Sequence, residues 1–172
     1  MKKRILSLAL ALLALTALAG CGGGSGGTTA APKADMEALQ QAMLAADPSL
    51  PEMLSITGSV EDAKRLFTYL SDFDYEKVDG YLLSYSSAGT ADELAVVAVK
   101  DPADVNDAKA SLEKHRGDRL KLFQTYGPEE AARVEKGEVF TEGPYAVLII
   151  CDDVQGVKDA FTGYLDGLTK EG

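Results

Sequence analysis

Residues 81–100 read YLLSYSSAGTADELAVVAVK, and this stretch decides the fold. Its two ends, YLLSYS and ELAVVAVK, are rich in strand formers, and the residues between them are small, polar and typical of turns. The stretch therefore predicts a β-hairpin with strands over 81–86 and 93–100. Asp101 and Pro102 follow directly and predict the start of a helix, because Asp can cap a helix and Pro is tolerated at its first position.

The same order recurs toward the C-terminus. Residues 138–142 are strand-like, Gly143-Pro144 indicates a turn, and YAVLIIC at 145–151 predicts a buried strand. Asp152 or Asp153 is then expected to cap a final helix. We therefore expect an α+β fold, in which two strand-turn-strand-helix units form a four-stranded antiparallel sheet with its helices packed on one face.

Two helices are expected before the first of these units. Apolar residues at 36, 39, 43 and 46 have helical spacing and predict a helix over 36–46 that ends before Pro48. Ser59 is the expected cap of a second helix, whose apolar stripe runs from Val60 to Leu70. Residues 36–172 are thus expected to form a single domain.

The first 20 residues have a different character. A basic start (KKR, 2–4) precedes an apolar run over 5–19, which is short for a membrane span but has the length of the apolar part of a signal peptide. The run ends in LAGC at 18–21, which resembles the bacterial lipobox. We expect a lipoprotein signal peptide over 1–20 and a diacylglyceryl anchor with palmitate-like chains on Cys21. An ordinary secretory signal that is cleaved near a cysteine is the alternative.

Residues 21–35 are rich in Gly, Ser and Thr and are expected to form a flexible tether behind the anchored Cys21. Two acyl chains hold a protein on a membrane stably, whereas one does so only marginally. The expected location is therefore the extracytoplasmic face of the cell membrane. An envelope protein could be a further partner.

Charge excludes one class of partner. Three of the 17 Lys and Arg residues lie in the first 20 residues, so the rest of the chain carries 14 basic against 27 acidic residues, a formal charge of −13. Nucleic-acid binding requires a basic surface, so nucleic acid is not an expected partner. No metal site or cofactor is expected either, since the chain has one His and its Gly-rich stretch does not open a strand–helix unit.

Four segments resemble a family of small bacterial lipoproteins: YLLSY (81–85), ADELAV (91–96), QTY (124–126) and GPYAVLI (143–149). The family is catalogued as domain of unknown function 4358, and the likeness covers about residues 60–165. The resemblance implies the lipid-anchored location and the fold, in Gram-positive, clostridia-like bacteria. It implies no activity and therefore assigns no catalytic residue.

The positions that recur in this family correspond to Asp92, Glu93, Tyr126 and Tyr145, which are candidate contacts for a ligand or a partner. For the acidic pair, a structural role and a binding role both remain open. We expect Asp92 to accept hydrogen bonds from amides of the turn. Glu93 is expected to reach outward or toward a cation on a neighbouring strand.

Other candidates have simpler interpretations. Cys151 lies in an apolar strand and is expected to be a small buried side chain. His115 lies in the middle of a predicted helix, and a catalytic triad would require Ser84, Ser86 or Asp118 to reach it in space.

The expected function is that of a membrane-anchored, extracytoplasmic binding or adaptor module without catalytic activity. One alternative is a cell-envelope enzyme that uses Asp92 or Glu93 as general base. Another is a small-solute-binding lipoprotein, which the size disfavours because the chain cannot form two lobes that close on a ligand.

Overall fold

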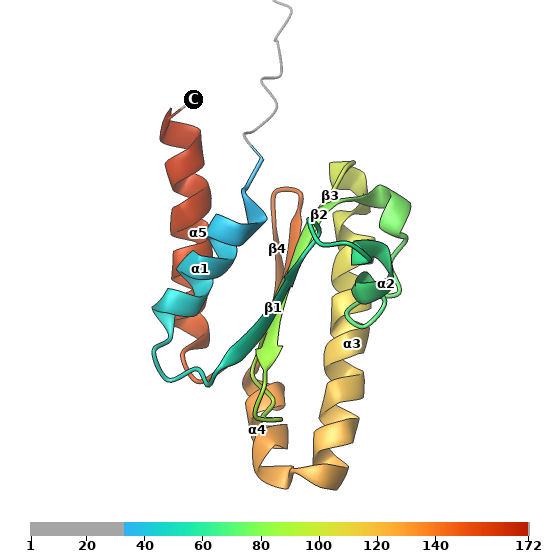
Figure 1. Ribbon diagram of the computed structural model, residues 1–172, viewed down its shortest axis with the longest axis vertical. Helices are drawn as coiled ribbons and strands as arrows, with labels where there is room; N and C mark the ends of the chain where they lie inside the picture. The colour runs from blue at the N-terminus through green and yellow to red at the C-terminus, as the bar shows by residue number, and fades with distance from the viewer. Residues whose placement is uncertain (1–32, 172) are drawn as a thin grey trace, which may run out of the picture. The chain divides into compact units, whose positions relative to one another are not determined.

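The computed structural model describes residues 33–171 (Figure 1). The expected signal peptide, Cys21 and most of the expected tether lie outside these residues. The described part holds five α-helices, five strands and two short 3₁₀ helices. In chain order the elements are α1 (Met36–Ala46), β1 (Met53–Thr57), α2 (Ala63–Phe67), a 3₁₀ helix (Tyr75–Lys77), β2 (Val78–Ser86), β3 (Glu93–Val99), a 3₁₀ helix (Pro102–Asp104), α3 (Val105–Tyr126), α4 (Pro128–Lys136), β4 (Glu138–Glu142), β5 (Tyr145–Ile150) and α5 (Val154–Glu171).

The strands form one antiparallel sheet in the order β1-β2-β3-β5-β4. β2 and β3 make one hairpin and β4 and β5 make the other, and the pairing of β3 with β5 joins them, with Ala95 opposite Leu148. This arrangement confirms the α+β class and the antiparallel sheet. The two units of strand, turn, strand and helix also follow the predicted order.

The sheet has a fifth strand that the sequence analysis missed. β1 pairs with the outer edge of β2, with Met53 opposite Ser86 and Thr57 opposite Leu82. The strand is short and half-exposed, so its sequence (MLSIT) carries only a weak apolar alternation. The predicted second helix is shorter than expected: it consists only of α2, and Asp62 rather than Ser59 precedes it.

The helices cover both faces of the sheet, so the expectation that they pack on one face is wrong. Figure 1 shows α1 and α5 on one side of the sheet and α2 and α3 on the other. Successive residues of β3 alternate between these layers: Ala95 packs in the core beneath α3, and Val96 packs in the core beneath α1 and α5. Every residue of β3 and β5 is buried. Strands that are apolar on both faces require cover on both faces.

The first helix follows its prediction. α1 spans Met36–Ala46, and the Asp35 carboxylate caps it by accepting hydrogen bonds from the backbone N–H groups of Glu37 and Ala38 at 2.9 and 3.0 Å. Asp153 caps α5 by accepting from the N–H of Gly156 at 2.9 Å. No helix within residues 33–171 is both long and apolar enough to cross a membrane.

A buried carboxylate connects these two helices. Asp47 follows α1, is 2 % exposed, and accepts hydrogen bonds from the Ser49 hydroxyl (2.5 Å), the Ser49 N–H (2.9 Å) and the Asp153 N–H (3.0 Å). Burial alone would raise the pKa of Asp47. The hydrogen bonds from Ser49 and Asp153 outweigh that effect and place the pKa below its ordinary value of 3.8.

The lowered pKa of Asp47 predicts how stability depends on pH. Ionised Asp47 stabilises the fold above the unfolded-state pKa, and that contribution is lost as the pH falls through the folded-state pKa. Asp47→Asn should therefore lower the free energy of unfolding by about 1–3 kcal/mol near neutral pH and by much less near about pH 3. Urea denaturation at both pH values measures the difference. The exposed Asp166→Asn is the matched control, and an equal loss at both pH values contradicts this role.

Candidate functional site

The acidic pair lies where the β2–β3 hairpin enters the core. Asp92 and Glu93 are 4 % and 2 % exposed, and both carboxylates are paired with basic side chains from helices. The sequence analysis placed Glu93 outward or against a neighbouring strand. It points inward instead, because the first position of β3 belongs to the row of side chains that faces α3.

Glu93 is held by two residues of α3. Its Oε1 atom lies 2.6 Å from Nε2 of His115, and its Oε2 atom lies 3.0 Å from Nη1 of Arg119. His115 and Arg119 are four residues apart on the helix, so their side chains share one face. An ionised carboxylate only accepts hydrogen bonds, so we assign the bonding proton to Nε2 of His115.

Asp92 is held mainly by α4. Its Oδ2 atom accepts from the Thr90 hydroxyl at 2.6 Å and lies 3.1 Å from Nη1 of Arg133. The expected bonds to amides of the turn do not involve Asp92. Instead Glu130 accepts from the Ala91 N–H at 2.8 Å and also pairs with Arg133 at 2.7 Å. The backbone at the end of the hairpin is thus bound by Glu130 of α4 and not by Asp92.

Glu93, His115 and Arg119 form the polar wall of a pocket of about 330 Å³. The rest of the lining is apolar or aromatic and comes from β1, from α2 and the residues just after it, and from β2. We call this site the Glu93 pocket, and its lining residues are Ile56, Leu66, Tyr69, Leu83, Tyr85, Glu93, His115 and Arg119. The Tyr69 side chain at its rim is 63 % exposed.

Arg119 is the least satisfied polar group of the Glu93 pocket. Nη1 forms an ion pair with Glu93, and Nη2 donates a hydrogen bond to the carbonyl of Ala91 at 3.0 Å. The guanidinium carbon lies 5.3 Å from the centre of the Phe123 ring. Nε of Arg119 is the buried side-chain nitrogen that finds no acceptor within residues 33–171. A buried donor without an acceptor is costly, so its presence calls for an explanation.

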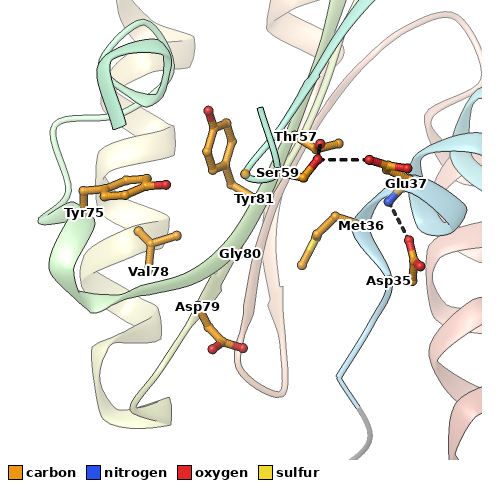
Figure 2. Close-up of a pocket in the computed structure, with 11 residues that line it drawn as sticks. Asp35, Met36, Glu37, Thr57, Ser59, Tyr75, Val78, Asp79, Gly80 and Tyr81 are labelled. Atoms are coloured by element: carbon orange, nitrogen blue, oxygen red, sulfur yellow. Dashed lines mark hydrogen bonds between the residues drawn. The ribbon is translucent and has the colours of Figure 1, made fainter. Parts of the chain in front are cut away.

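A second pocket, of about 400 Å³, lies beside the start of α1 (Figure 2). Its acidic residues already have structural partners. Asp35 caps α1, Glu37 accepts from the Ser59 hydroxyl at 3.0 Å, and Asp79 pairs with Lys33 at 2.5 Å. We therefore do not treat this pocket as the candidate site.

The other predicted contacts do not join the Glu93 pocket. Tyr126, at the end of α3, is 80 % exposed and lies in a groove beside the β2–β3 turn. Tyr145 is buried at the opposite end of the sheet, where its hydroxyl accepts from the N–H of Ala34 at 3.1 Å and its ring packs against Phe161. Tyr145 is thus placed as a core residue. Cys21 lies outside the described residues.

Sequence reasoning missed the roles of His115 and Arg119. Their spacing of four residues on a helix was a usable signal, but only the fold shows that Glu93 meets them. The triad considered for His115 does not form. Ser84 faces the opposite side of the sheet, where it bonds Gln40 at 2.9 Å, and Asp118 pairs with Lys121 at 2.9 Å.

Cys151 is a core residue, as expected. It is 2 % exposed and packs in the core beneath α1 and α5. Burial, with a smaller contribution from the Asp47 charge, raises the pKa of the Cys151 thiol to about 12. The thiol is therefore protonated at neutral pH and is a poor nucleophile.

The geometry predicts unequal costs for removing the two acids. Glu93→Ala leaves both His115 and Arg119 without a carboxylate in a mostly buried site, so it should lower the free energy of unfolding by about 2–4 kcal/mol. Asp92→Ala should cost about 1–2 kcal/mol, because Arg133 keeps Glu130 as a partner. Chemical denaturation measures both losses. The exposed Glu142→Ala is the control, and a Glu93→Ala loss no larger than that of the control contradicts this account.

Comparison with known proteins places this site within a family. The sequence model of a family described as "Domain of unknown function (DUF4358)" matches residues 52–151, a range that includes the whole sheet and every residue lining the Glu93 pocket. No curated protein and no solved structure matches the chain. The family match spans more than half of the chain, so the resemblance expected from the sequence is confirmed, and the chain belongs to the family of the domain of unknown function DUF4358.

Proposed function

We propose that this protein is a lipid-anchored, extracytoplasmic binding module without catalytic activity, and that the Glu93 pocket holds its ligand. The observation that carries the proposal is a cluster of the buried Glu93 with the partly buried His115 and Arg119, which forms one wall of an otherwise apolar and aromatic pocket. Pockets that bind small molecules are typically apolar, with a few fixed polar groups that orient the ligand. This pocket is formed without two lobes, because its lining comes from one sheet, from the α2 region and from α3.

The contacts of Glu93 favour binding over catalysis. Each of its oxygens already has a partner, His115 for one and Arg119 for the other, so neither is free to act as a general base. None of the residues that line the Glu93 pocket is a serine, threonine or cysteine that could act as a nucleophile. An enzyme using Asp92 or Glu93 is therefore the weaker proposal.

The anchor proposal rests on the basic start, the apolar run and the lipobox-like LAGC at 18–21. Within the described unit, Lys33 pairs with Asp79 at one end of β2, whereas Tyr85 lies near the other end. At about 3.3 Å per residue, the Glu93 pocket lies about 20 Å along the sheet from the point where the described chain begins. A tether attached there leaves the pocket free to meet a ligand.

The anchor predicts a simple labelling result. Cys21→Ser removes the thiol that would be acylated, so cells fed a radiolabelled fatty acid should give a labelled wild-type protein and an unlabelled variant. Cys151→Ser is the matched control, because its buried thiol should not be acylated. Equal labelling of wild type and Cys21→Ser contradicts the lipoprotein proposal.

The pocket predicts a binding result that one substitution should abolish. Leu66 lies in the lining of the Glu93 pocket and is only partly buried, so Leu66→Trp should block the site with little loss of stability. Ligand-observed NMR with a fragment library and nanodisc-held protein should find compounds that bind wild type but not Leu66→Trp. Leu122→Trp, at an exposed position of α3 outside the pocket, should bind them normally. Fragments that bind all three proteins alike, or none, contradict a ligand site in the pocket.

A further inference from the structure

We infer that the ligand of the Glu93 pocket is a small amphipathic molecule with one anionic oxygen-bearing group, such as a carboxylate, which pairs with Arg119. This inference rests on the proposed function and specifies the chemistry of its ligand. The argument has three parts: the unused hydrogen-bond capacity of the pocket, its size and lining, and the charges around it.

The unused hydrogen-bond capacity lies mostly in donors. An arginine side chain carries five N–H groups, and Arg119 uses them for one hydrogen bond, to the carbonyl of Ala91, and one ion pair, with Glu93. Nε is buried and has no acceptor within the described chain. Both oxygens of Glu93 are already engaged. Because Nε is buried while the Arg119 side chain as a whole is 19 % exposed, a ligand acceptor would meet the remaining N–H groups of the two Nη atoms. A carboxylate matches these groups of arginine best.

Size and lining select an apolar body for the same ligand. Ile56, Leu66 and Leu83 supply aliphatic surface, and Tyr69 and Tyr85 supply aromatic surface. The volume of about 330 Å³ lies at the small end of the range of about 300–1,000 Å³ that is typical of ligand pockets. A compact hydrocarbon or aromatic body with one polar end fits this space, whereas a sugar would leave its hydroxyl groups without partners.

Local charge is compatible with an anion although the protein is acidic. Glu93 and Arg119 offset each other, and His115 adds a positive charge when it is protonated. On α2, Arg65 donates to the Tyr69 hydroxyl at 3.4 Å and is itself paired with Asp62. The lining residues from β1 and β2 are uncharged. Acidic groups farther away are screened over about 8 Å at physiological salt.

Three probes with the same hydrocarbon test the inference: phenylbutyrate, phenylbutanamide and phenylbutylamine. Titration calorimetry with nanodisc-held protein, against empty nanodiscs, should show phenylbutyrate binding at least about tenfold more tightly than the neutral amide, with the amine weakest. Arg119→Lys keeps the positive charge opposite Glu93 but removes the planar fork. It should reduce the preference for phenylbutyrate over the amide to about threefold or less. Leu122→Trp should keep the full preference.

The outcomes separate the ligand class from the pocket itself. If the amide or the amine binds as tightly as phenylbutyrate and Leu66→Trp abolishes that binding, the anionic class is wrong and the proposed pocket function stands. A preference for phenylbutyrate that persists in Arg119→Lys also overturns the inference, provided that thermal unfolding shows the variant to be folded. If none of the probes binds, the inference falls, whereas the proposed function falls only if the fragment screen also finds no binding that depends on Leu66.

Discussion

The two central strands, β3 and β5, bury every side chain on both faces of the sheet, and this burial determines where the helices can lie. A sheet that is apolar on both faces is stable in water only when a layer of helices covers each face. α1 and α5 cover one face, and α2, α3 and α4 cover the other. The same requirement brings α3 directly over the first residue of β3, which is Glu93.

Glu93 is therefore a carboxylate in a row of side chains that is otherwise apolar. Burying a carboxylate without a partner is costly, and in this fold His115 and Arg119 supply the partners of Glu93. A buried ion pair seldom makes a protein more stable than apolar residues of similar volume would. The cluster is thus poorly explained by stability alone, and the incomplete hydrogen bonding of Arg119 indicates the same. Local conflicts of this kind are expected at functional sites.

Much of the fold could be predicted because its signals are local. The spacing of apolar residues and the position of Pro48 predict α1 at 36–46, and the turns at the hairpins define the strands around them. The fifth strand, at 53–57, could not be predicted with the same ease, because its pairing depends on the free edge of β2. The coverage of both faces was predictable in principle. The continuous apolar runs of β3 and β5 are typical of strands that are buried on both sides.

The site was only half predictable for a similar reason. Glu93 stood out as a position that recurs in the family, but its partners are 22 and 26 residues away on another element. The most direct test of the central claim is a high-resolution crystal structure of the protein purified from the cells that naturally produce it. The account predicts non-protein density in the Glu93 pocket, with an acceptor within hydrogen-bond distance of the Arg119 guanidinium. A pocket filled by the protein's own side chains, with Arg119 fully bonded to protein groups, would contradict it.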